Sequence, residues 1–135
     1  MPFFTWNPSY SVNVKDMDTQ HKTMVEIINR LHEAMMVGKG SSEIAGIIAE
    51  NVKYTQFHFT SEEKLLSSNA YPAFNKQKTE HQACAKKVLE FQAQYQSGKI
   101  ALSVEVLNFL KDWWTNHIQG EDKKYGAFLN GKGVN

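Results

Sequence analysis

The chain has 135 residues, 41% of them hydrophobic, and a formal net charge of +1. This size and apolar content suit a single compact domain with a real core. Because the 15 basic and 14 acidic residues are spread along the chain rather than grouped, we expect neither nucleic acid nor an anionic membrane as a partner.

The cysteine content and the N-terminal residues bear on the cellular compartment. Cys84 is the only cysteine, so no internal disulfide can form. The first residues lack the basic stretch and the long apolar run of a secretion signal. No segment approaches the roughly 18 uninterrupted apolar residues of a spanning helix. We therefore expect a cytoplasmic protein.

Four helices are predicted after an irregular N-terminal arm. Glycines follow the first and third helices, Pro72 separates the second from the third, and Gly120 interrupts the pattern after the fourth. Four helices with short connections favour an all-α fold, an antiparallel up-down-up-down four-helix bundle. The approximate helix ranges are 16–37, 41–69, 73–96 and 103–119.

The apolar spacing supports this bundle, because the expected inward stripes repeat at helical spacing, mostly in steps of three and four residues. In the first and third helices the stripes contain Met17, His21, Met24, Ile28, Leu31 and Met35, and Phe74, Gln77, His81, Cys84, Val88, Phe91 and Tyr95. In the second and fourth helices they contain Ile44, Ile48, Thr55, His58, Glu62 and Leu65, and Val106, Leu110, Trp113 and His117.

Several polar side chains fall on these inward stripes, which is costly unless a partner satisfies them. Side chains four residues apart lie one turn apart on one helix face, as expected for His58 with Glu62 and for Gln77 with His81. In an up-down bundle, the starts of the first and third helices share one end with the ends of the second and fourth. The candidate metal-binding residues at that end are His21, His58, Glu62, Gln77, His81, His117 and Asp122.

Two residues need a separate argument. Asp122 follows His117 by five positions, which on a continuous helix would turn it roughly 140° away at ~100° per residue. We expect a break at Gly120 to return Asp122 inward. His32 lies about 16 Å along the axis from His21 at ~1.5 Å per residue, so we expect it at a polar flank position outside the site.

Imidazoles and carboxylates without a thiolate suit a borderline first-row metal such as iron, manganese or zinc. The candidate ligands are too many for one tetrahedral zinc ion. Two metal ions bridged by the carboxylates of Glu62 and Asp122 would use the ligands economically and leave the imidazoles to be divided between the ions. The residues therefore predict a dinuclear site.

Four groups of residues carry a family resemblance: Asp18-Thr19-Gln20-His21-Lys22, His58-Phe59-Thr60-Ser61-Glu62-Glu63, Tyr71-Pro72 followed by Glu80-His81, and Trp113-Trp114-Thr115-Asn116-His117-Ile118 followed by Asp122. Together they resemble the bacterial hemerythrins, a non-haem di-iron family. The resemblance covers nearly the whole chain and implies a single hemerythrin-like domain over residues 1–135.

The resemblance implies two iron ions per chain, joined by an oxo or hydroxo bridge, that bind dioxygen reversibly for carriage, storage or delivery. It assigns His21 and His58 to the oxygen-binding iron and His81 and His117 to the other iron. Small anions are implied as further ligands, and no protein acceptor of the oxygen is specified. Glu62 and Asp122 become the bridges, and the apolar oxygen pocket is lined by Met24, Phe59, Trp113, Trp114 and Ile118.

Two positions depart from the family pattern. Gln77 stands where the family has a fifth histidine, four residues before His81. Because an amide oxygen is a weaker donor than imidazole, Gln77 could coordinate poorly, hydrogen-bond to a metal-bound water, or leave that iron open. Trp114 stands where relatives often carry a smaller leucine, and its bulk could narrow the route into the pocket.

Two classes of function follow. The first is an oxygen-binding protein without turnover. The alternative is a redox enzyme-like site, in which an open position at Gln77 gives oxidase or peroxidase-type reactivity. Catalysis of that kind needs a proton donor and a route for a reductant, and beyond the ligands no histidine or acidic residue is plainly placed for either task. We therefore expect binding rather than enzymatic activity.

Overall fold

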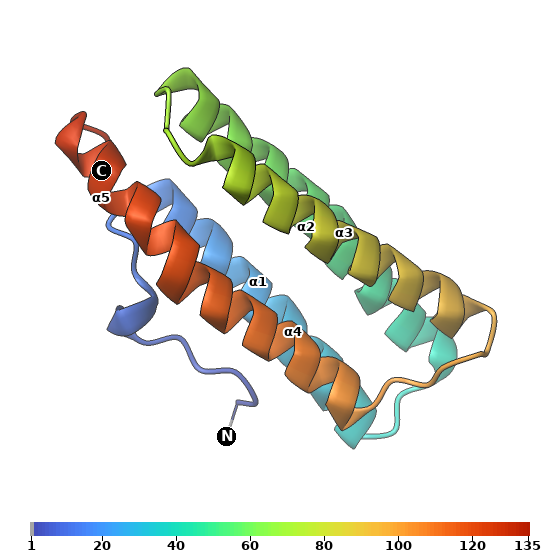
Figure 1. Cartoon of the computed structure of the whole chain (residues 1–135). Helices are drawn as coiled ribbons and strands as arrows, with labels where there is room; N and C mark the ends of the chain where they lie inside the picture. The colour runs from blue at the N-terminus through green and yellow to red at the C-terminus, as the bar shows by residue number, and fades with distance from the viewer. Residues whose placement is uncertain (1) are drawn as a thin grey trace.

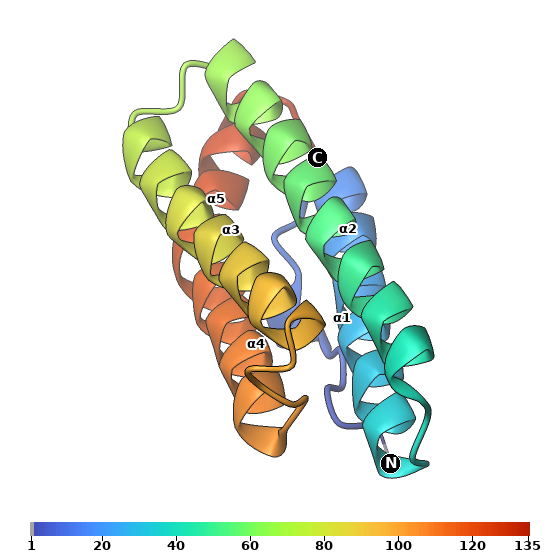
Figure 2. The same ribbon diagram turned by 90° about the vertical axis from the view of Figure 1, so that its right-hand side faces the viewer.

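The computed structural model describes residues 2–135, and within them every regular element is helical. Four long helices run antiparallel in sequence order (Figure 1), and a second view shows them around one common interior (Figure 2). The predicted up-down-up-down bundle is therefore confirmed. The helix bounds are α1 Lys15–Met36, α2 Ser41–Ser68, α3 Phe74–Gln96 and α4 Val104–His117.

Glycine conformations and one side-chain cap explain where these helices stop and start. Gly38 and Gly98 follow α1 and α3 with φ values of 70° and 76°, a left-handed conformation that costs glycine little. The Ser103 hydroxyl oxygen accepts a hydrogen bond from the backbone N–H of Val106 at 3.3 Å and so caps α4. These local conformations therefore set where the chain leaves one helix and enters the next.

Two further elements extend the chain beyond α4, and the sequence did not predict them. A π-helical turn, η2 Ile118–Asp122, follows α4 directly, and the short helix α5 Lys123–Gly131 continues from it. Figure 1 shows α5 at the same end of the bundle as the start of α1. A third short element, the 3-10 turn η1 Pro8–Tyr10, belongs to the N-terminal arm.

The core confirms the central positions of the predicted seams, whereas Met35, Leu65, Phe74, Phe91 and Tyr95 are only partly buried.

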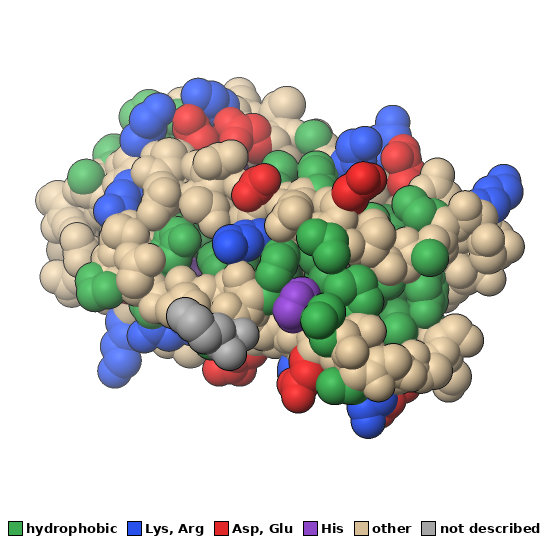
Figure 3. Space-filling model, turned by 90° about the horizontal axis from the view of Figure 1, so that it is seen from below, with side chains coloured by type: hydrophobic (Ala, Val, Ile, Leu, Met, Phe, Trp, Pro, Cys, Tyr) green, Lys and Arg blue, Asp and Glu red, His purple; other side chains and the backbone are tan. Residues whose placement is uncertain are grey.

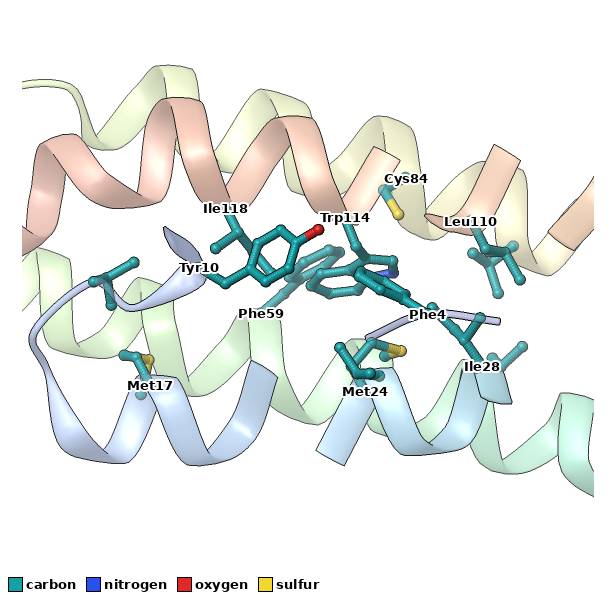
Figure 4. Close-up of a cluster of buried hydrophobic side chains, with 14 of the residues drawn as sticks. Phe4, Tyr10, Met17, Met24, Ile28, Phe59, Cys84, Leu110, Trp114 and Ile118 are labelled. Atoms are coloured by element: carbon teal, nitrogen blue, oxygen red, sulfur yellow. The ribbon is translucent and has the colours of Figure 1, made fainter. Parts of the chain in front are cut away.

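The inner face of α4 also differs from the prediction. There the buried residues are Leu107, Leu110, Trp114 and His117, whereas Val106 and Trp113 are only half-buried. The predicted and the observed inner faces of α4 share Leu110 and His117, so helical spacing alone could not decide between the two faces. Figure 4 shows Met17, Met24 and Ile28 of α1 facing Leu110 and Trp114 of α4 and Ile118 of η2 across the core, with Phe59 of α2 between them.

The N-terminal arm packs along the bundle rather than away from it. Asn29 of α1 accepts a hydrogen bond from the Phe4 backbone N–H and donates one to the Phe4 carbonyl oxygen, both at 2.7 Å. This places the Phe4 and Tyr10 side chains in the core cluster (Figure 4). A Cβ added to Gly126 of α5 would lie 2.1 Å from the carbonyl oxygen of Val12, so the arm and α5 meet backbone to backbone.

The surface in Figure 3 mixes acidic and basic side chains around a central hydrophobic area, without a large region of one charge. No helix within residues 2–135 is long and apolar enough to cross a membrane. Cys84 is buried in the core, and burial raises the pKa of its thiol to about 12. This cysteine is therefore a packing residue with an inert thiol.

Candidate metal centre

All of the predicted ligands meet inside one end of the bundle. Each long helix contributes at least one of them, and the turn η2 contributes the last. Each is at most 4% exposed, so the inward positions predicted from spacing are confirmed. The residues are His21 of α1, His58 and Glu62 of α2, Gln77 and His81 of α3, His117 of α4 and Asp122 of η2.

The two carboxylates divide their oxygens between two pairs of imidazoles. Glu62 places Oε2 3.3 Å from His58 Nε2 and Oε1 3.0 Å from His81 Nε2. Asp122 places Oδ2 3.2 Å from His21 Nε2 and Oδ1 3.1 Å from His117 Nε2. The structure therefore brings His21 together with His58 on one side of the carboxylates and His81 together with His117 on the other.

These donors form two overlapping groups that could each hold a metal ion. In each group the donor atoms lie within 4.8 Å of one another. Glu62 belongs to both groups, and Asp122, which is counted in the second, also contacts His21 of the first. One group is His21, His58 and Glu62, and the other is Glu62, His81, His117 and Asp122.

The prediction that a break at Gly120 returns Asp122 inward is wrong. Gly120 lies inside η2, does not have a positive φ, and has space for a Cβ with no atom within 4 Å. A π-helical turn is wider than an α-helical turn and pairs residues five apart. The π turn, rather than the glycine, therefore brings Asp122 onto the same inner face as His117.

Three of the imidazoles are held by hydrogen bonds from their outer nitrogen. The Nδ1 atoms of His58, His81 and His117 lie 2.7, 2.8 and 3.0 Å from oxygen atoms. Because those oxygens accept, each Nδ1 carries a proton, and Nε2 is the nitrogen that faces the interior and binds a metal once it is deprotonated. The accepting oxygens are Gln20 Oε1, Glu63 Oε2 and Glu80 Oε1, in the same order.

The sequence reasoning gave these supporting residues no role, although a signal was available. Gln20, Glu63 and Glu80 are each the immediate neighbour of a ligand on their own helix. Each reaches across to the imidazole on the next helix of the bundle. A polar residue beside a ligand is therefore a candidate support for the ligand that follows in the bundle.

Tyr125 is a further residue that the sequence reasoning missed. It is fully buried on α5, and its hydroxyl donates a hydrogen bond to Glu62 Oε2 at 2.5 Å. Burial and the nearby charges of Glu62 and Asp122 raise the pKa of Tyr125 well above its usual range. The hydroxyl is therefore a permanent donor to this carboxylate at neutral pH.

Aromatic rings enclose the centre. Phe59 stacks on His81 with ring centroids 4.0 Å apart, and Trp113 stacks on His117 at 4.5 Å. Trp114 lies against His58 at 5.6 Å, and Met24 and Ile118 are buried in the same core cluster. His32 lies outside the centre, stacked on Phe3 of the arm at 4.5 Å, as its axial position predicted.

The electrostatics of the centre suit a cation. Burial lowers the pKa of His21 and of His117, but interactions with Asp122 and Glu62 outweigh burial and raise both to about 9. Burial would raise the pKa of Glu62, but His58 and His21 hold it well below its usual range. In the metal-free protein, ionised carboxylates thus hold protons where a metal cation would sit.

The polar atoms that the protein leaves unsatisfied fit the same interpretation. Within residues 2–135, several buried nitrogen and oxygen atoms that face the interior of the centre have no hydrogen-bond partner, which is costly for buried polar groups. Nitrogen and carboxylate donors in this number and spacing fit two first-row metal ions. Besides Trp114 Nε1 and Thr115 Oγ1, the unsatisfied atoms are Nε2 of His21, His58, His81 and His117, His21 Nδ1, Glu62 Oε1, Gln77 Oε1 and Asp122 Oδ2.

Comparisons with known proteins agree with this site. Residues 12–129 match the family model described as the hemerythrin HHE cation binding domain. The bacteriohemerythrin of Methylococcus capsulatus is 31% identical over 131 residues, which cover 96% of this chain and 99% of that protein. The bacteriohemerythrin of Pseudomonas aeruginosa is 34% identical over 93% of this chain and 80% of its own. A solved wild-type hemerythrin superposes with a TM-score of 0.88 at 31% identity, covering 93% of this chain and 96% of its own.

Proposed function

This chain belongs to the hemerythrin family, and on that premise we propose that it is a non-haem di-iron protein that binds dioxygen reversibly for carriage, storage or delivery. One observation carries the proposal. Glu62 and Asp122 each turn one oxygen to the His21 and His58 side and the other to the His81 and His117 side. Two bridging carboxylates between two imidazole pairs are what a dinuclear centre requires.

The proposed ligand assignment follows this division. His21 and His58 would hold the first iron, His81 and His117 would hold the second, and Glu62 and Asp122 would bridge them. The iron pair, when bound, supplies the electrons for binding dioxygen. Because the Gln77 amide adjoins the His81 and His117 side through Asp122 Oδ1, the first iron would be the one that keeps a position for an exogenous ligand, either dioxygen or a small anion.

Apolar side chains packed around the whole centre would keep water away from that position. Met24, Phe59, Trp114 and Ile118 are each at most 4% exposed, and Trp113 packs against both Phe59 and Trp114. We assign these residues to the oxygen pocket. A dry, apolar pocket admits a small neutral gas and keeps out the protons and water that promote oxidative loss of bound oxygen.

Binding without turnover is the better supported function. The matched relatives are named bacteriohemerythrin and myohemerythrin, which does not favour the redox alternative. Glu63 and Glu80 lie beside the ligands but accept hydrogen bonds from His81 and His117. The Tyr125 hydroxyl donates its hydrogen bond to Glu62. These groups orient ligands rather than deliver protons to a substrate.

An oxygen titration tests the proposal. The protein is loaded with ferrous iron without oxygen, titrated with dioxygen while its visible spectrum is recorded, and then purged with argon. We expect an absorption band that saturates with oxygen and disappears on purging over several cycles. His32→Ala, which changes a histidine outside the centre, should behave in the same way. Continuous oxygen consumption, or oxidation that argon does not reverse, would contradict oxygen carriage.

A further inference from the structure

Gln77 is the one residue of the centre whose chemistry the two-iron assignment leaves undefined. It is fully buried on α3, one turn before His81, and its amide nitrogen Nε2 donates a hydrogen bond to Asp122 Oδ1 at 3.0 Å. This orientation of the amide is fixed by charge, because turning the amide oxygen toward a carboxylate oxygen would set two acceptors against each other. The carbonyl oxygen Oε1 must therefore point elsewhere.

The Oε1 atom has no hydrogen-bond partner within the described part of the chain. A buried amide oxygen without a partner loses its hydration and gains nothing in return. Two further unsatisfied atoms of the second group, His81 Nε2 and His117 Nε2, are assigned to the second iron, and His81 is one turn away on the same helix face. Gln77 also contacts Asp122 Oδ1, which lies 3.1 Å from His117 Nε2, so its amide adjoins the position proposed for the second iron.

Resting on the di-iron function above, we propose that Gln77 is a ligand of the second metal through its carbonyl oxygen Oε1. The Nε2 atom meanwhile keeps its hydrogen bond to Asp122, so one side chain both binds the metal and orients a bridge. A glutamine carbonyl is a neutral, hard oxygen donor, weaker toward iron than an imidazole. Besides the two bridging carboxylates, the second metal would then be held by two imidazole nitrogens and an amide oxygen, and its affinity would depend on that oxygen.

A simpler role for Gln77 gives different expectations. In that role the amide only donates to Asp122, and its oxygen contributes nothing. Gln77→Leu removes both the donor and the oxygen. Gln77→Glu keeps an oxygen at the same reach but, when ionised, has no proton to donate to Asp122. The glutamate variant therefore separates a ligand from a hydrogen-bond donor.

Cobalt binding provides the measurement, because the visible absorption of Co²⁺ reports its coordination and no oxygen chemistry interferes. The metal-free protein and each variant are titrated with Co²⁺ against a competing chelator, and the affinities of both binding steps are recorded. Asn51→Leu is the matched control, since it removes another buried amide, on α2 and two turns before His58. Circular dichroism of the metal-free forms checks that each variant folds.

We expect Gln77→Leu to weaken the second binding step by at least about tenfold and to change the absorption of the second ion. Gln77→Glu should keep both steps at wild-type strength or better, and Asn51→Leu should change neither. Loss of the second ion in both Gln77 variants, or in neither, overturns the proposal. If Gln77→Leu does not fold, Gln77→Ala, which also removes both the donor and the oxygen, takes its place. A wild-type chain that binds fewer than two Co²⁺ ions would instead contradict the dinuclear function itself.

Discussion

Tyr125 of α5 donates its hydroxyl proton to Oε2 of Glu62 of α2 at 2.5 Å, and both side chains are fully buried. This contact links the short C-terminal helix to a carboxylate that we propose bridges the metal pair. Hydrogen bonds of this kind fix the orientation of a metal ligand and are typically as important as the ligand's own position. The helix α5 is therefore part of the metal centre.

Tyr125→Phe should loosen Glu62 while leaving the aromatic packing in place. We expect metal loss to a chelator to become roughly 10–100 times more favourable, because the bridging carboxylate loses its buried donor. Metal content after dialysis against a graded series of chelator concentrations measures this effect. Tyr71→Phe is the control, since Tyr71 packs edge-on against Tyr125 at 6.4 Å without contacting the carboxylate. Equal metal retention in both variants would exclude a role for the Tyr125 hydroxyl.

Glu62→Ala should lose metal far more readily than His32→Ala. Glu62 faces both imidazole groups with different oxygens, so its loss removes a ligand and a negative charge from each metal position. His32 stacks on Phe3 outside the centre. Elemental analysis of the two variants, purified side by side, makes the comparison. If the two retain the same amount of metal, Glu62 is a buried polar core residue and not a bridge.

Metal affinity and metal-free stability should respond to pH in opposite directions. Burial is outweighed by Asp122 and Glu62, which raise the pKa of His21 and His117 from 6.5 to about 9. Metal binding must displace these protons, so the apparent metal affinity should increase as pH rises toward about 9. The same raised pKa stabilises the metal-free fold fully below pH 6.5, and this stabilisation is lost as pH rises through about 9.

Chelator competition and thermal unfolding between pH 6 and 10 test these two trends on one preparation. Proton release on metal addition, followed with a pH indicator, provides a direct check. A metal affinity that does not change over this interval would show that neither His21 nor His117 carries a proton in the metal-free centre.

Two glycine substitutions should have opposite effects on stability. A Cβ at Gly126 would lie 2.1 Å from the Val12 carbonyl oxygen, whereas a Cβ at Gly120 meets no atom within 4 Å. Gly126→Ala should therefore displace the N-terminal arm and destabilise the fold by about 1–3 kcal/mol. Gly120→Ala should be neutral or stabilise it by up to about 1 kcal/mol. Denaturant unfolding of the metal-free proteins measures both, and a large loss with Gly120→Ala would restore a structural need for that glycine.

The sequence predicted the bundle and the inner ligand positions because both depend on helical periodicity. His58 and Glu62 are four residues apart, as are Gln77 and His81, and this spacing survives in any regular helix. The inner face of α4 was predicted less well, because Trp113 and Trp114 are adjacent and equally hydrophobic. Only packing against the other helices decides that Trp114 is buried and Trp113 half-buried.

The contributions of η2 and of Tyr125 could not be read in the same way. The five-residue spacing from His117 to Asp122 contradicts an α-helix, and a glycine between them suggested a break rather than a π turn. Both solutions return Asp122 inward, so only the backbone geometry separates them. Tyr125 contacts Glu62 across 63 positions of sequence, and no local pattern marks a contact of that range.

The iron content of the purified chain tests the central claim most directly. The protein is reconstituted with ferrous iron under reducing, oxygen-free conditions, desalted, and analysed for iron and protein on the same sample. The shared carboxylates of Glu62 and Asp122 predict close to two irons per chain. One iron per chain, or none, would contradict the dinuclear centre.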